Sequence, residues 1–161
     1  MTWLSSISPV EHTLNEIFSV LSPELYHAGM EAREELQHSS NNNIVLAATT
    51  WVSCFTGISV IANHVTPPHI DTFGHYCWYD LLAAAGRYTR CKFRFRDLGG
   101  ECDYLPGTLL AINGNFIQHE VDDWEGPDRI CYAHFMRKAV LKRLGVEGPS
   151  WVTLNHFSQL L

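Results

Sequence analysis

The sequence lacks several features that define well-known classes of protein. Its first residues show no basic stretch followed by a long apolar one, so we expect no signal peptide. No apolar run is long enough to cross a bilayer, and we therefore expect no membrane partner. Internal repeats, low-complexity tracts and a linker to a second domain are also missing. We expect a single domain over residues 1–161 in an intracellular protein, either cytoplasmic or nuclear.

Paired cysteines are lacking as well. The chain has five cysteines, an odd number, and none of them forms a C-x-x-C pair. This pattern argues against both a disulfide framework and a structural zinc site. We expect reduced thiols that behave as small buried side chains. They are Cys54, Cys77, Cys91, Cys102 and Cys131.

An excess of positive charge is missing too. The 11 Lys and Arg residues are outnumbered by 17 Asp and Glu residues, for a net charge of −6. No global field would therefore draw the chain to nucleic acid. A local cluster holds five of the cations, and it suits either phosphate contacts or a solvated sheet face. The cluster consists of Arg87, Arg90, Lys92, Arg94 and Arg96.

What the sequence does contain begins with helix signals. The capping box Ser8-Pro9-Val10-Glu11 predicts the start of a first helix, and Ser22-Pro23-Glu24 predicts a second that ends near His38. A short helix over residues 138–144 should end at Gly145. We expect the tail to pack back on the body through three apolar side chains. These are Trp151, Leu154 and Phe157.

Between the helices the residue types and the turn signals favour strands with short turns. Asn113-Gly114-Asn115 is typical of a tight hairpin turn between two of these strands. Helices followed by many short strands predict an α+β, mainly β domain, a sandwich or barrel braced by helices. We assign residues 1–43 to helical support, 44–137 to the β core and 138–161 to a C-terminal helix and tail. The predicted strands cover residues 44–48, 55–63, 79–85, 90–96, 109–112, 116–121 and 128–136.

One short segment holds the residues with the most distinctive chemistry. His69 and Asp71 follow two prolines, and on a strand their side chains would point to the same side. The best third ligand is His119, on a later predicted strand. Two histidines and one carboxylate with open positions form the facial triad of non-haem Fe(II) oxygenases. We therefore predict a metal site and no catalytic residues beyond its ligands.

These residues belong to an ordered set. His69-Ile70-Asp71, Pro106-Gly107-Thr108, His119 and Arg129 occur in the order that resembles the Fe(II)/2-oxoglutarate-dependent dioxygenases. The details resemble the TET/JBP-like branch in its small basidiomycete-type members, over residues 51–151. The resemblance implies a double-stranded β-helix core (jelly-roll, cupin-like) and Fe(II) bound by His69, Asp71 and His119.

The resemblance also implies a site for the co-substrate 2-oxoglutarate. Its far carboxylate would bind Arg129, which can contact a carboxylate through two N–H groups, with the small side chain of Cys131 beside it. Arg129 and His119 are ten residues apart, a spacing that suits neighbouring strands joined by a hairpin. The rivals for this role are Arg137, Lys92, Arg94 and Arg96.

The implied reaction is the O2-dependent oxidation, or hydroxylation, of a substrate C–H bond, with 5-methylcytosine or thymine in DNA as substrate. Two alternatives stay open: the same chemistry on a small metabolite or amino-acid side chain, and a catalytically silent metal-binding β-barrel. The branch often has a basic residue where this chain has Ile70, and arginine where it has His64. These differences bear on the substrate, whose expected contacts are Asn63, His64, Ile70, Phe73 and Trp78.

Overall fold

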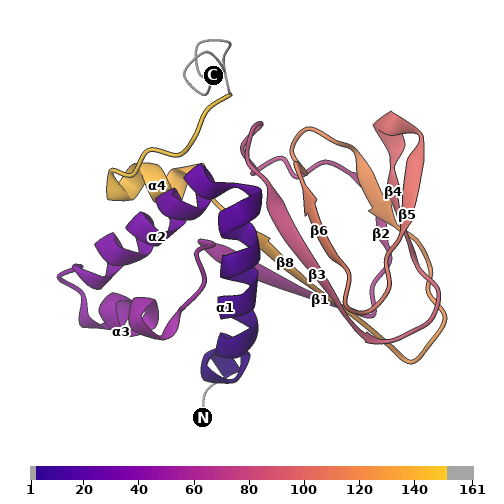
Figure 1. Ribbon diagram of the computed structural model, residues 1–161, viewed down its shortest axis with the longest axis horizontal. Helices are drawn as coiled ribbons and strands as arrows, with labels where there is room; N and C mark the ends of the chain where they lie inside the picture. Colours follow the sequence, from indigo (N-terminus) through magenta and orange to yellow (C-terminus); the bar gives the residue numbers. More distant parts are fainter. Residues whose placement is uncertain (1–2, 152–161) are drawn as a thin grey trace.

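The computed structural model describes residues 3–151, with four helices in one half of the molecule and the strands in the other (Figure 1). α2 begins after Ser22 with Pro23 in its first turn and ends at Gln37, as predicted. The residues that face the sheet from α1, such as Leu14 and Phe18, are buried. The helices are α1 (Trp3–Leu21), α2 (Pro23–Gln37), α3 (Asn42–Thr50) and α4 (Lys138–Leu144).

Two predictions about the helical half are wrong. α1 begins at Trp3, so that Pro9 lies inside the helix, where the loss of one backbone donor is tolerated. Residues 44–48, predicted as a strand, belong to α3, because Asn41 caps this helix by accepting the N–H of Asn43 at 2.9 Å. The run was too short for apolar content to distinguish helix from strand. The β core consequently begins at Gly57 and not at residue 44.

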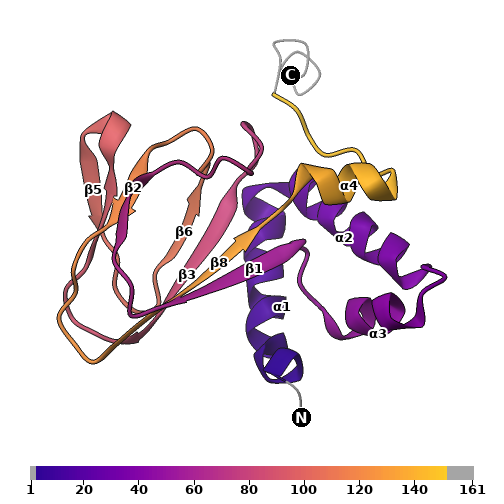
Figure 2. The same cartoon turned by 180° about the vertical axis from the view of Figure 1, so that it is seen from behind.

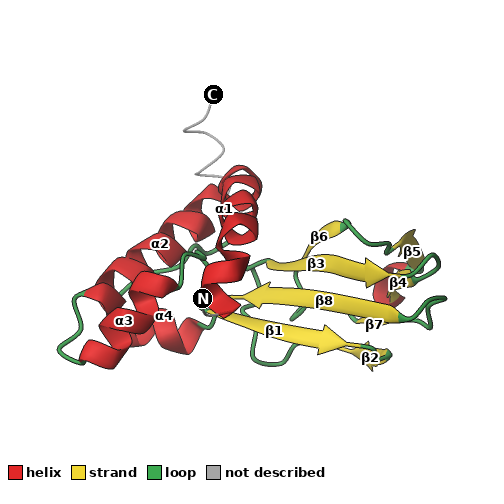
Figure 3. Ribbon diagram, turned by 90° about the horizontal axis from the view of Figure 1, so that it is seen from below, coloured by secondary structure: helices red, strands yellow, loops and turns green. Residues whose placement is uncertain are grey.

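The strands form two four-stranded antiparallel sheets that pack face to face, which is a jelly-roll (Figure 3). The major sheet has the order β1-β8-β3-β6 and the minor sheet the order β2-β7-β4-β5. This is the double-stranded β-helix expected from the resemblance. The strands are β1 (Gly57–Ala62), β2 (Thr66–His69), β3 (Asp80–Arg87), β4 (Lys92–Phe95), β5 (Gly100–Asp103), β6 (Leu109–Ile112), β7 (His119–Val121) and β8 (Asp128–Phe135); a 3-10 turn, η1 (Arg96–Leu98), follows β4.

The predicted hairpin at residues 113–115 is also wrong. β6 pairs with β3 in the major sheet, whereas β7 pairs with β2 and β4 in the minor sheet. The segment between them therefore crosses from one sheet to the other. For the same reason β7 and β8, which carry His119 and Arg129, are not paired strands. Turn residues show where the chain bends, but not which strand it meets afterwards.

Two buried apolar clusters hold the layers together. One lies between the sheets and includes Phe93 and Tyr104, and the other joins the helices to the outer face of the major sheet through Phe18, Phe55 and Leu81. Figure 2 shows α1 lying across the end of the major sheet at which β1 and β3 begin and β8 ends. The helices thus brace the sheet that carries Arg129.

Several smaller expectations concern the cysteines and the two ends of the chain. All five cysteines are free thiols, as predicted. Trp151 is about half-exposed and its ring lies 5.9 Å from that of Tyr76, while Leu154 and Phe157 lie outside the described residues. Among the described helices, none is both long and apolar enough to span a bilayer.

Candidate metal centre

The three predicted metal ligands meet at one end of the minor sheet. His69 is the last residue of β2 and His119 the first of β7, and the two are paired across the ladder with ring centroids 4.3 Å apart. Asp71 lies in the loop after β2, so the expectation that it shares a strand face with His69 is wrong. The strand ends at His69, and the turn that follows still brings the carboxylate back to both imidazoles.

The distances fit a bound ion. The two carboxylate oxygens of Asp71 lie 3.7 Å from His69 Nε2 and 3.7 Å from His119 Nε2. One ligand atom from each of the three residues lies within 4.8 Å of the others. Two nitrogens and one oxygen on one side of a small space are the donor set of a facial triad, which leaves the opposite positions open.

Main-chain carbonyl groups orient both histidines. The Nδ1 atom of His69 lies 2.9 Å from Pro67 O, and the Nδ1 atom of His119 lies 2.9 Å from Ile117 O. A carbonyl can only accept, so each Nδ1 carries the proton and each Nε2 presents a lone pair towards the ion. The same spacing of two residues occurs twice, so this backbone geometry fixes the tautomer of both ligands.

The environment of His119 also favours its neutral form. Burial lowers the pKa of His119, the hydrogen bond to Ile117 O opposes this shift, and the neighbouring His69 lowers the pKa further. Phe93 stacks on the imidazole with a ring separation of 5.4 Å and an angle of 8°. Since a metal binds neutral imidazole, these contacts prepare His119 to be a ligand.

The loop at residues 113–115 holds Asp71 in place. Gly114 O accepts the Asp71 N–H at 2.8 Å, and the side-chain amide of Asn115 donates to Asp71 O at 2.9 Å. A Cβ on Gly114 would overlap the Asp71 carboxylate. The sequence signal for this role was present but was interpreted as a hairpin turn. The segment is instead a support for the metal-binding carboxylate.

Arg129 lies deep between the sheets without an anionic partner. Its side chain is 1% exposed, Nη1 donates to His64 O at 2.9 Å, and Nε has no hydrogen-bond partner. The guanidinium contacts the faces of Tyr104 and Trp124, at 5.6 and 5.8 Å from the ring centroids. No carboxylate among residues 3–151 forms an ion pair with it. A buried charge in this state is completed by a bound anion.

Two predicted substrate residues instead hold Arg129. Asn63 has a positive φ of 51°, and its side-chain oxygen accepts the N–H of Arg129 at 2.8 Å. His64 contributes its main-chain oxygen, and its side chain is exposed. Cys131 is buried on the same strand, with Sγ 3.2 Å from the Tyr104 hydroxyl. Asn63 therefore holds the backbone of Arg129, and His64 holds its guanidinium through a main-chain oxygen just after β1.

A cavity of about 140 Å³, which we call the metal pocket, opens beside Asp71 between β1, β3 and β8. Asp80 and Arg137 line this cavity. Asp80 was not predicted as a site residue, and Arg137 was considered only as a rival of Arg129 for 2-oxoglutarate. Burial, together with the charge of Asp71, raises the pKa of Asp80 to about 7. The Arg137 guanidinium lies over Phe135, 4.3 Å from the ring centroid, and 5.6 Å from that of Phe73. Besides Asp71, the pocket thus carries one further acid, Asp80, and one cation, Arg137.

The remaining predicted substrate residues divide into two groups. Phe73 and Ile70 are exposed, on either side of Asp71 in the chain, and Phe73 reaches Arg137. Trp78 is buried in the cluster between helices and sheet, where its indole N–H donates to Pro149 O at 2.8 Å. Trp78 therefore packs against the C-terminal segment, away from the metal pocket. Phe73 thus contacts a residue that lines the metal pocket, Ile70 is an exposed neighbour of Asp71 in the chain, and Trp78 lines neither the metal pocket nor its border.

The basic cluster of the sequence is neutralised within the chain. Arg94 pairs with Glu101 at 3.1 Å and with Asp122 at 2.6 Å, and Lys92 pairs with Asp103 at 2.8 Å. The other three members of the cluster are paired as well, with Asp128, Glu125 and Glu120. The sheet-face interpretation therefore fits better than phosphate contacts, because each cation already has an anionic partner.

The chain is similar to known proteins in sequence and in fold. Residues 2–138 match the Tet_JBP family model, described as the oxygenase domain of the 2OGFeDO superfamily. Among solved structures, NgTET1 in complex with 5mC DNA is similar, with a TM-score of 0.62 and 14% sequence identity. That match covers 98% of this chain and 58% of NgTET1, so the chain spans a little over half of that protein. No curated protein matches the chain.

The similarity to NgTET1 is structural, and at this low sequence identity it shows a shared fold and no more. The family model covers most of the chain and includes all three ligands and Arg129. It describes an oxygenase, which decides between an enzyme and the silent barrel that the sequence left open. The chain belongs to the Tet_JBP family of 2-oxoglutarate- and Fe(II)-dependent oxygenases.

Proposed function

We propose that His69, Asp71 and His119 bind Fe(II), and that the protein hydroxylates a C–H bond of a methylated pyrimidine, 5-methylcytosine or thymine, in nucleic acid. The observation that supports this most directly is the convergence of the three ligand atoms within 4.8 Å, with both imidazoles in the tautomer that exposes Nε2. When bound, Fe(II) supplies the oxidising chemistry, with O2 and 2-oxoglutarate as co-substrates.

The protein's own residues bind, orient and shield the reactants. Arg129 would bind the far carboxylate of 2-oxoglutarate, because it is a buried guanidinium whose Nε has no partner and which pairs with no carboxylate among residues 3–151. Cys131 is its small neighbour on the inner face of β8. The aromatic rings of Tyr104 and Trp124 flank the guanidinium and exclude water from it.

The substrate would enter by the metal pocket. Its volume of about 140 Å³ suits a single small ring or methyl-bearing group. Asp80 and Arg137 supply an acceptor and a donor within reach of such a ring. The nucleic-acid substrate is supported by the similarity in fold to NgTET1, which was solved with 5mC DNA.

A small-molecule substrate is the second candidate, favoured by the pairing of all five cations in the basic cluster. Succinate release separates the two candidates when a 5-methylcytosine oligonucleotide and a panel of metabolites are compared. Stimulation by the oligonucleotide but not by its unmethylated form supports the first candidate. The reverse result, stimulation by a metabolite alone, would replace it.

The metal and co-substrate assignment has its own test. Anaerobic addition of Fe(II) and 2-oxoglutarate should give a weak visible charge-transfer band. His119→Ala should remove the band, whereas His27→Ala, at an exposed position on α2, should leave it unchanged. A band that persists in His119→Ala would show that the metal binds elsewhere.

A further inference from the structure

A second cavity, of about 420 Å³, opens beside the metal pocket; we call it the shelf pocket. In two pairs of consecutive residues, one residue lines the metal pocket and the next lines the shelf pocket. Gly74 and Arg137 line the metal pocket, and their neighbours His75 and Lys138 line the shelf pocket. The two cavities therefore lie close together in the fold, on either side of these two chain segments.

One wall of the shelf pocket is a stack of rings. His75 stacks with Tyr76 on one side and with Trp78 on the other, each with centroids 4.4 Å apart at 27°. The stack is anchored, because the Trp78 indole donates to Pro149 O and a Cβ on Gly148 would overlap the Trp78 ring. Tyr76 remains 47% exposed. The outer ring of a rigid stack is thus available for a further planar group.

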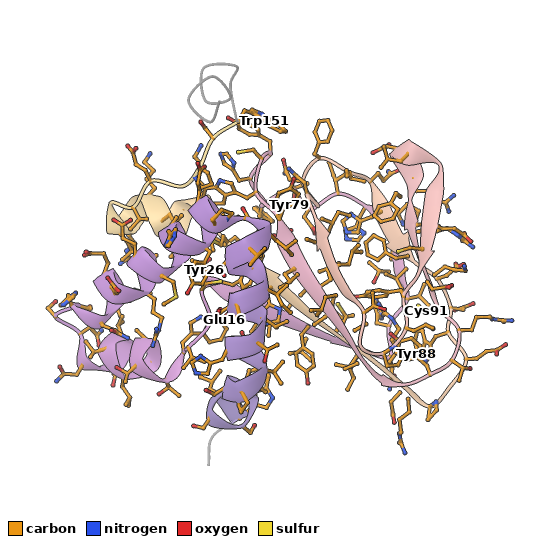
Figure 4. The ribbon with its side chains drawn as sticks, viewed as in Figure 1. Glu16, Tyr26, Tyr79, Tyr88, Cys91 and Trp151 are labelled. Atoms are coloured by element: carbon orange, nitrogen blue, oxygen red, sulfur yellow. The ribbon has the colours of Figure 1, made fainter. Side chains whose placement is uncertain are left out.

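Trp151 extends this aromatic surface. Figure 4 shows it at the end of the described chain, above the junction of the helical and β halves. Its ring lies 5.9 Å from that of Tyr76 and is 55% exposed. Large exposed aromatic rings beside each other are the usual platform for stacking nucleic-acid bases.

The lining of the shelf pocket also carries two cations that form no ion pair with the described residues. Lys138 and Lys142 lie one turn apart on α4, so both side chains project from the same face of the helix. Both are exposed, and neither forms an ion pair with any residue in the described range 3–151. Burial and, secondarily, the charge of Lys138 lower the pKa of His75, which places Lys138 near the ring stack. Among the described residues, Glu147 is the one acidic side chain that lines the shelf pocket.

We propose that the shelf pocket binds a nucleotide of a nucleic-acid strand next to the base that enters the metal pocket. Lys138 and Lys142 would bind its phosphate groups, and Tyr76 would stack on its base. Cations along a groove combined with aromatic platforms are the features by which single strands are bound without sequence readout. The inference rests on the proposed function, since it adds a neighbouring nucleotide to the same substrate.

The first test measures binding of a fluorescent single-stranded oligonucleotide by anisotropy at several salt concentrations. The double variant K138A/K142A should bind at least about tenfold more weakly than the wild type, with a salt slope reduced by about 2. R143A removes a cation from the same helix outside the pocket and should change the affinity by less than about twofold. Equal losses in K138A/K142A and R143A, or no binding by the wild type, would overturn the proposal.

Two further comparisons define the ligand class. Tyr76→Ala should weaken oligonucleotide binding by about fivefold or more, and Tyr76→Phe should restore it, because a base stacks on either ring. Poly-glutamate added as competitor should not displace the oligonucleotide at equal charge concentration. Displacement by poly-glutamate, or an unchanged affinity in Tyr76→Ala, would show a general anion site and not a nucleotide site.

The failure of this inference can be distinguished from the failure of the proposed function. K138A/K142A should retain the Fe(II) and 2-oxoglutarate charge-transfer band of the wild type, since neither lysine lines the metal pocket. A band in both proteins without a difference in oligonucleotide binding would reject the shelf pocket alone. The absence of a band in the wild type would reject the metal assignment itself.

Discussion

Two deeply buried ionic groups lie on the same strand, β8, and differ in how they are completed. Arg129 points between the sheets and has no carboxylate partner among the described residues. His134 is 0% exposed on the helix-facing side, where its Nε2 lies 2.9 Å from the Glu11 carboxylate and its Nδ1 lies 3.2 Å from Leu81 O. One charge is paired within the fold, and the other is left for a ligand.

The difference separates structure from function within one element. A buried charge without a partner carries a large desolvation cost, so a fold keeps one only where something else binds it. The pair of Glu11 and His134 joins α1 to the major sheet, and each side chain is the ionic partner of the other. One Glu11 oxygen has no hydrogen-bond partner. Electrostatic incompleteness, more than burial, is therefore the observation that supports the proposed co-substrate role of Arg129.

The largest expected effect comes from removing the incomplete charge. Arg129→Ala should raise the 2-oxoglutarate concentration needed for half-maximal succinate release by about 100-fold, since a buried charge-assisted contact contributes on the order of 3 kcal/mol. The concentration of Fe(II) needed should change by less than about threefold, because the three ligands are untouched. Titration of each component at saturating levels of the other provides the measurement. Equal shifts for iron and 2-oxoglutarate would remove Arg129 from this role.

The completed pair should show the opposite behaviour. Glu11→Ala leaves His134 without its carboxylate and should lower the free energy of unfolding by about 3 kcal/mol, with no change in the 2-oxoglutarate requirement. Urea denaturation and the succinate assay measure the two quantities. Glu16→Ala is the matched control on the exposed side of α1 and should change stability by less than about 0.5 kcal/mol (Figure 4). An altered co-substrate requirement in Glu11→Ala would erase the contrast between the two charges.

The same pair should also give the protein a pH-dependent stability. Burial raises the pKa of Glu11, but the hydrogen bond and positive charge of His134 outweigh it, so that the net pKa lies below the usual value of 4.5. Because the folded-state pKa is lower than the unfolded one, the stabilisation is present above pH 4.5 and is lost as the pH falls through the folded value. Glu11→Gln should flatten this acid limb in urea denaturation curves. An identical acid limb in the variant and the wild type would assign the loss to other carboxylates.

The smallest effect should come from the paired cations on the surface. Arg87→Ala breaks an exposed ion pair with Asp128 and should cost no more than about 1 kcal/mol in the free energy of unfolding. Oligonucleotide affinity should stay within about twofold of the wild type, since this cation is already neutralised. Thermal unfolding and anisotropy check both statements. A tenfold loss of affinity would return the basic cluster to the nucleic-acid interface.

The sequence predicted local chemistry better than spatial relations. His69, Asp71 and His119 could be chosen because residue type, order and spacing together restrict the choice, and β3 and β8 were predicted within a few residues of their observed bounds. The roles of Asn113-Gly114-Asn115 and Asn63 were missed, because each depends on a partner that is distant in the chain. The pairing of Glu11 with His134 spans most of the sequence, and no local pattern encodes it.

The segment misread as a strand illustrates the same limit at the level of backbone. The β-branched side chains of Ile44 and Val45 and the apolar Leu46 suit a strand. Asn41 nevertheless caps a helix here, and among the residues of α3 only Ala48 is fully buried. Propensity is a weak prior over so short a run, and packing against α2 decided the outcome.

The cross-strand position of His69 and His119 would give a bound metal a role in selecting the correct strand register. β2 and β7 are short, and their ladder already contains an irregularity between Thr66 and His69. A slip of one residue would turn one imidazole to the opposite face and leave the ion with an incomplete set of ligands. Fe(II) would then bind only the ladder in the correct register. Its binding would stabilise that register relative to ladders shifted by one residue, and so favour the strand alignment on which its own site depends.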